Sequence, residues 1–124
     1  MRDVEVTSSD RRLKQDIHTI PDALERVRRL RGVNYHRIGS PPEERQYGVI
    51  AQDVREVLPD AVLSLNAPSA GGIAGKGAAS QRPEETLYVD YNSLVAVLIE
   101  AVKTQEARIQ KLERQIEQLE PLGP

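Results

Sequence analysis

The sequence predicts an α+β fold, in which short strands form a small sheet beside short helices and one long C-terminal helix. Stretches such as VNYHRI and TLYVDY alternate apolar and polar residues, as half-buried strands do. Residues 92–120 contain neither glycine nor proline and repeat apolar residues at helical spacing. The length of 124 residues is that of one small domain with an extension.

The predicted elements follow one another at short intervals. Apolar spacing predicts a first helix that Thr19 caps, that has Pro21 in its first turn and that ends before Gly32. Alternation predicts four short strands, over residues 33–38, 47–50, 61–65 and 86–91. A second helix is expected over residues 51–58. Gly, Ala, Ser and Pro dominate residues 66–83, which predicts a flexible insertion.

Composition excludes several classes of function. Hydrophobic residues make up 39% of the chain and aromatic residues 3%, so the core is thin or is completed by other chains. The net charge of −2 argues against a nucleic-acid partner. No apolar window is long enough for a transmembrane helix, so no membrane partner is expected, and the polar N-terminus is not a signal peptide.

Residues able to bind a metal or a cofactor are scarce. The absence of cysteine excludes disulfides, thiolate metal sites and cysteine nucleophiles. The two histidines, His18 and His36, have no cluster of further ligand residues nearby. We therefore expect no metal, no cofactor and no small-molecule ligand.

Ser9 and Lys14 are the notable candidate for catalysis. A neutral lysine can accept the proton of a serine hydroxyl and so make it a nucleophile. Because an amine in water carries a proton, this role requires burial, which the apolar neighbours Leu13 and Ile17 would supply. The spacing alone is a weak signal, since Ser and Lys occur five residues apart in almost any chain, and by itself it favours a solvated turn.

The last segment, residues 92–120, carries a heptad repeat. Its seam consists of Val95, Val102, Ile109 and Ile116 at position a, and of Leu98, Gln105, Leu112 and Leu119 at position d. A 3.5-residue spacing sustained this long predicts association between helices of different copies. Branched residues at a with Leu at d favour two helices, but Gln105 weakens that preference, so these residues leave dimer and trimer open. Residues 121–124 form a tail.

Three ordered blocks resemble the S74 peptidase domain. They are SSDRRLKQDI at residues 8–17, YGVIAQDVREVLPDAV at residues 47–62 and VDYNSLVAVLIEAVKTQ at residues 89–105. Residues that fit the family pattern include Gly48, Ala51, Gln52, Val54, Pro59, Tyr91, Leu94, Ala101 and Lys103. The resemblance covers roughly Ser9 to Leu119. This family forms the C-terminal intramolecular chaperone of phage endosialidases, tail fibres and neck appendages, and also occurs in myelin regulatory factor proteins.

The resemblance implies a function for each segment. Residues 1–8 would be the remnant of an upstream fibre or linker, residues 9–91 the chaperone and self-cleavage domain, and residues 92–120 the helix of a homotrimer. The trimer would hold an upstream fibre or tailspike domain of the same chain in register while it folds. Ser9 would then act as nucleophile and Lys14 as general base. Cleavage would separate Ser8 from Ser9, although the bond after Ser9 stays open.

Two alternatives remain. The chain could be a trimerisation module that never cuts itself, or the self-cleaving domain of a membrane-bound transcription factor. Its ending in LEPLGP, with no membrane segment, favours the phage setting. We then expect the domain to act in the cytoplasm of an infected bacterium during assembly. It would afterwards be removed from the mature virion fibre or stay at its end.

Overall fold

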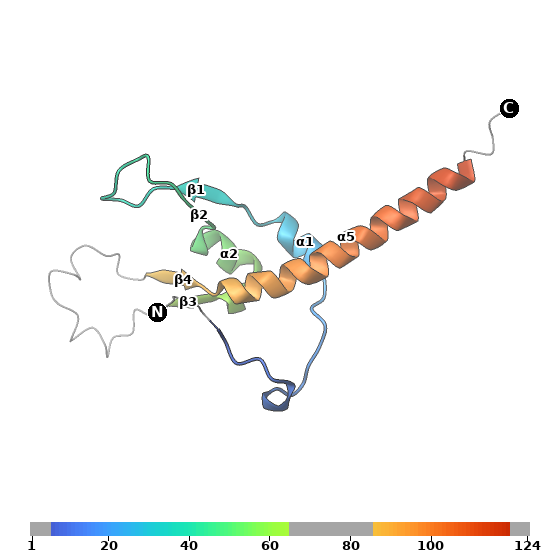
Figure 1. The fold of residues 1–124 in the computed structure, drawn as a ribbon, viewed down its shortest axis with the longest axis horizontal. Helices are drawn as coiled ribbons and strands as arrows, with labels where there is room; N and C mark the ends of the chain where they lie inside the picture. The colour runs from blue at the N-terminus through green and yellow to red at the C-terminus, as the bar shows by residue number, and fades with distance from the viewer. Residues whose placement is uncertain (1–5, 65–85, 120–124) are drawn as a thin grey trace.

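The computed structural model describes residues 6–64 and 86–119, and confirms the α+β class (Figure 1). The expected insertion at residues 66–83, the tail at residues 121–124 and residues 1–5 of the expected remnant lie outside the described residues. In chain order the elements are η1 (Arg11–Leu13), α1 (Ala23–Arg28), β1 (Val33–Tyr35), β2 (Gln46–Gly48), α2 (Ala51–Val57), η2 (Pro59–Ala61), β3 (Val62–Ser64), β4 (Leu87–Val89) and α5 (Tyr91–Leu119). The two elements marked η are single turns of 3-10 helix.

The strands form two separate antiparallel pairs instead of one small sheet. Strand β1 pairs with β2, with Val33 opposite Gly48, and β3 pairs with β4, with Val62 opposite Val89. Each strand has three residues and is shorter than predicted. In the β1–β2 hairpin, pairing stops after Tyr35 because the chain turns, with Ser40 donating through its backbone N–H to the Arg37 carbonyl at 2.9 Å.

Helix α1 begins later than predicted, and Thr19 does not cap it. Asp22 precedes the helix in the left-handed conformation, with φ of 54°, and its side chain makes no capping hydrogen bond. Ile20 packs against the core, so the chain is already fixed there and turns into the helix only after Pro21. The helix ends at Arg28, well before Gly32, where the backbone N–H of Arg29 bonds back to the carbonyl of Arg26.

The core lies against one face of the first three turns of α5. Its buried residues come from α1, α2, η2 and α5, and are Ala23, Val54, Leu58, Ala61, Leu94, Val97 and Ala101. Helix α1 packs along α5 (Figure 1), and the carboxylate of Glu25 meets the guanidinium of Arg108 at 3.3 Å at the end of this contact. The core is therefore small and lies at one end of the long helix.

Helix α5 begins at a well-capped turn, packs on the core with its first turns and then extends away from the other elements. Asp90 accepts from the backbone N–H of Asn92 at 3.1 Å and from the hydroxyl of Ser93 at 3.0 Å. The first of these bonds satisfies a backbone donor that the first helical turn leaves free, and the second joins the two side chains. Figure 1 shows the second half of α5 projecting beyond all other described elements, and residues 102–119 are exposed on every side.

Candidate active site

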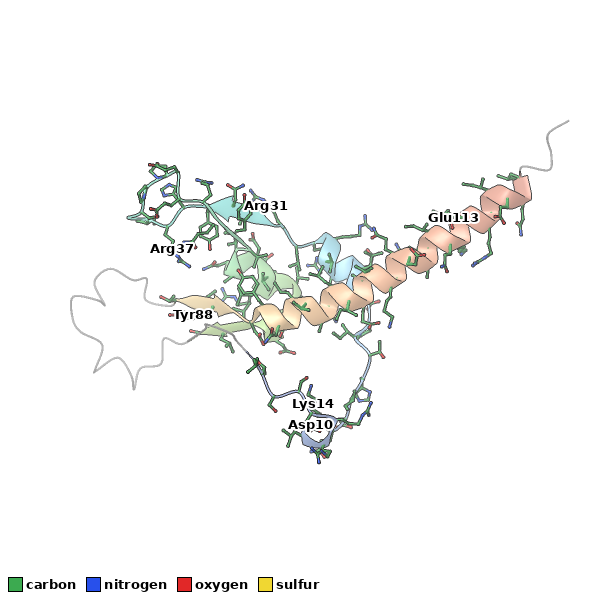
Figure 2. The ribbon with its side chains drawn as sticks, viewed as in Figure 1. Asp10, Lys14, Arg31, Arg37, Tyr88 and Glu113 are labelled. Atoms are coloured by element: carbon green, nitrogen blue, oxygen red, sulfur yellow. The ribbon has the colours of Figure 1, made fainter. Side chains whose placement is uncertain are left out.

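Ser9 and Lys14 lie on an N-terminal arm, residues 6–19, that is exposed along its whole length. The turn η1 gives the arm its shape, because the Asp10 carboxylate accepts from the backbone N–H of Arg12 at 2.8 Å. The backbone N–H of Lys14 closes the turn by donating to the carbonyl of Arg11 at 3.0 Å. Figure 2 shows Asp10 and Lys14 at the far end of this arm, away from the sheets.

The electrostatics of the arm centre on Asp10 and Arg12. Their side chains form an ion pair at 2.8 Å. The Arg12 side chain, and then its backbone N–H, stabilise the ionised carboxylate and hold the pKa of Asp10 below its usual range. The same carboxylate raises the pKa of Arg12. Asp10 therefore stays charged and keeps the turn formed at neutral pH.

The turn brings the two predicted catalytic side chains into contact. The Lys14 Nζ donates to the Ser9 Oγ at 2.6 Å. A nucleophile and its base need such a distance for direct proton transfer. Spacing of five residues allowed this contact without requiring it, and the intervening capped turn provides it.

The expected burial of the Ser9–Lys14 pair is absent from the single chain. Leu13 is 73% exposed and Ile17 is 58% exposed, so neither removes the amine from water. The expectation that these neighbours desolvate Lys14 is wrong for one copy alone. The reason is that the arm stands away from the body, and its hydrogen bonds, within the described residues, all lie inside the arm.

The predicted seam lies along α5 as expected, but no other part of the described chain buries it. The packed face of the helix carries Leu94, Val97 and Ala101. The seven apolar residues of the seam are instead exposed, with exposed fractions between 46% and 63%. They are Val95, Leu98, Val102, Ile109, Leu112, Ile116 and Leu119. Gln105 is exposed in the same row. The helix thus has two apolar faces, one occupied by the body and one open.

A cavity that the sequence did not reveal lies beside the start of α5. It has a volume of about 400 Å³, and three of the four tyrosines, Tyr35, Tyr88 and Tyr91, line it together with Arg37. The guanidinium of Arg37 lies over the Tyr35 ring, 5.9 Å from its centre. These residues come from both hairpins and α5, so no local pattern brings them together.

Few other features suggest a ligand. Within residues 6–64 and 86–119, no three His, Cys, Asp or Glu side chains gather as metal ligands would. Among the helices of that same part of the chain, none combines the length and the apolar character needed to cross a bilayer.

Comparison with known proteins gives the class. Residues 9–63, which begin at the serine of the contact above, match the S74 peptidase family, described as the chaperone of endosialidase. Over these residues the chain is thus similar to the S74 peptidase family.

The relatives are fibre proteins of phages. The long tail fibre protein Gp37 of Enterobacteria phage K3 is 33% identical over 111 residues, which is 87% of this chain and 8% of that protein. The Gp37 of Enterobacteria phage T2 is equally identical over the same length, 87% of this chain and 7% of its own. The Gp37 of Salmonella phage S16 is 28% identical over 127 residues, 98% of this chain and 15% of its own. The chain thus spans a small part of each relative.

Proposed function

We propose that this chain is an assembly chaperone that joins three copies of an upstream fibre and then cuts itself off beside Ser9. The observation that carries the cleavage is the 2.6 Å contact between the Lys14 Nζ and the Ser9 Oγ. It lies at the first residue of the stretch that matches the chaperone family. The assembly role is supported by the relatives, which are long tail fibre proteins.

The chemistry of the cleavage follows from the two side chains. Lys14, as a neutral amine, takes the hydroxyl proton of Ser9, and the Oγ attacks the carbonyl carbon of Ser8. The amide C–N bond breaks, and the nitrogen of Ser9 leaves with the proton from Lys14. The acyl group of Ser8 is then an ester on the Ser9 Oγ. Water hydrolyses this ester, which releases the Ser8 carboxylate and restores the hydroxyl.

Association of three copies is supported by the open face of α5. Helix α5 has 29 residues, and its part beyond Arg108, the partner of Glu25, is exposed throughout and has little to keep it helical alone in water. Its open face follows the heptad spacing of a coiled coil. Covering that face in a homotrimer holds the three upstream chains side by side, which removes much of the entropy cost of bringing them into register.

The fibre relatives favour a phage setting over a membrane-bound transcription factor. Assembly would then take place in the cytoplasm of the infected bacterium. The module would leave the mature fibre after cleavage, or remain at its end if cleavage fails. No cofactor, metal or small-molecule ligand takes part in this scheme.

A reporter protein fused before residue 1 tests the cleavage. We expect the wild type to split, and Ser9→Ala and Lys14→Ala to stay whole, while the matched Ser8→Ala control still splits. Intact mass of the released C-terminal product identifies the bond, since a break after Ser8 or after Ser9 gives products that differ by one serine. An intact wild type that still assembles would refute self-cleavage and leave an assembly module.

The seam is tested in the Ser9→Ala chain, which does not lose its reporter. Leu112→Asp places a charge in the seam and is expected to convert trimers to monomers in light scattering. Gln118→Asp adds the same charge one heptad position outside the seam and should leave the trimer intact. Equal behaviour of the two variants, or a wild-type chain that is monomeric at high concentration, would show that the seam does not associate.

A further inference from the structure

The arm presents side chains that match the cavity in chemistry. Leu13 and Ile17 are exposed apolar side chains on a segment whose other residues, apart from Val6 at its start, are polar. Asp16 lies between them in sequence and takes a left-handed backbone conformation with φ of 58°, so the chain bends there. The arm therefore offers two apolar groups and one carboxylate close together.

The cavity offers the complement. Tyrosine rings and the side chains of Val49 and Leu87 give it apolar walls, and Arg37 adds a cation. Among the described residues, neither Arg37 nor Asp16 has an ion-pair partner. No residue of the arm lines the cavity in the single chain, so both surfaces are unoccupied by each other.

We propose that the arm of one copy docks into the tyrosine-lined cavity of a second copy, with Leu13 and Ile17 on its apolar walls and Asp16 beside Arg37. The docked neighbour excludes water from the contact between Ser9 and Lys14. This inference rests on the proposed function, because it assigns the cover that the cleavage chemistry needs. The cleavage site is then incomplete in any single copy.

The position of the seam identifies the second copy as the occupant. Tyr91 is both a wall of the cavity and the first residue of α5, and the seam begins one turn later at Val95. Copies joined along this seam in parallel place their cavities at the same end of the assembly. The arm enters the body at Ile20, beside the helices that pack against α5. Each arm thus lies at the level of its neighbours' bodies.

Disulfide formation between two chains tests the docking and does not depend on cleavage. The chain has no cysteine, so a single introduced pair can be followed in the full-length Ser9→Ala protein. One tagged chain carries Ile17→Cys and a differently tagged chain carries Tyr88→Cys. We expect mild oxidation to link the two tags. Tyr47→Cys, which is exposed on β2 outside the cavity, is the matched control and should not link.

A charge exchange between chains tests the role of docking in cleavage. Asp16→Arg and Arg37→Glu are each expected to slow cleavage at least about tenfold when expressed alone. Co-expression of the two single variants should restore it in part, because opposite charges then meet at positions 16 and 37 in at most two of the three contacts of a mixed trimer. The double variant in one chain should also cleave, and Gln15→Arg should cleave like the wild type.

The outcomes separate the two proposals. A disulfide between tags supports docking even if the wild type never cleaves, in which case only the proposed cleavage fails. A disulfide that forms only within a third variant, which carries both Ile17→Cys and Tyr88→Cys in one chain, overturns docking between copies, and so does the absence of any disulfide. Docking between copies is also overturned if the double variant cleaves but co-expression of the single variants does not restore cleavage. The arm would then bind the cavity of its own chain.

Discussion

Gly48→Ala tests the contact that fixes the β1–β2 hairpin, and with it one wall of the cavity, to the start of α5. A Cβ at Gly48 would lie 2.7 Å from the hydroxyl oxygen of Tyr91. Its next neighbours, atoms of Tyr35, lie at 3.6 and 3.8 Å, which are ordinary contacts. Gly48 lies in strand β2, so the new methyl group changes packing and leaves the backbone conformation unaffected.

The size of the destabilisation by Gly48→Ala depends on how far the ring of Tyr91 can move away. Inserting a methyl group into a packed contact costs typically about 1–3 kcal/mol. Tyr91 is half exposed, so its ring can move, and we expect Gly48→Ala to lower the free energy of unfolding by about 1–2 kcal/mol. Tyr91→Phe removes the clashing oxygen and also the long bond that Val49 N–H donates to it at 3.4 Å. Losing that bond costs about 0.5 kcal/mol.

The double variant decides whether the hydroxyl is the cause. With Tyr91→Phe present, Gly48→Ala should cost almost nothing further, which gives a coupling of about 1–2 kcal/mol between the two sites. Urea unfolding at one fixed protein concentration, in the Ser9→Ala chain, measures all four proteins. Gly32→Ala is the control, because nothing lies within 4 Å of its added Cβ. Additive effects, or equal effects of the two alanine variants, would refute the contact.

Three further perturbations have defined outcomes. Val54 is 1% exposed, so Val54→Ala should lower the free energy of unfolding, measured by urea unfolding, by about 2–3 kcal/mol. A loss below about 1 kcal/mol would show that neighbouring side chains move in to fill the cavity. Because the folded pKa of Asp10 is lowered, its bond to Arg12 is fully present above the unfolded pKa, near 3.9, and is lost as the pH falls through the folded value. An NMR titration of the Arg12 amide should show this step and Asp10→Asn should lack it; a step in both would assign it elsewhere. Glu25→Gln breaks the exposed ion pairs of Glu25 with Arg28 and Arg108 and should change the free energy of unfolding by less than about 1 kcal/mol; a larger loss would show that these pairs stabilise the packing of α1 on α5.

The sequence was sufficient for those parts of the fold that depend on neighbours along the chain. The 29 residues of α5 follow from uninterrupted helical spacing, and the strand positions follow from alternation. The contact between Ser9 and Lys14 is also local, but the five-residue spacing only allows it, and the capped turn between the two residues provides it.

Other features depend on residues far apart in sequence. The split into two sheets is set by which strands meet, and alternation does not specify a partner. The cavity joins Tyr35 and Tyr91 across 56 residues, and composition alone gave no reason to group the tyrosines. The start of α1 at Ala23 depends on Ile20 packing against the core, which overrides the more obvious cap at Thr19.

The small core gives a reason why cleavage should wait for assembly. Three of its seven buried residues are alanines, so the core of one chain buries little apolar area. The open seam of α5 supplies the missing apolar area only when copies associate, so stability should rise with concentration. The arm, meanwhile, leaves Ser9 and Lys14 in water as long as the chain is single. If both proposals hold, the association of three copies that completes the core also covers the cleavage site. A monomeric chain would then not cleave, and its fibre would stay attached.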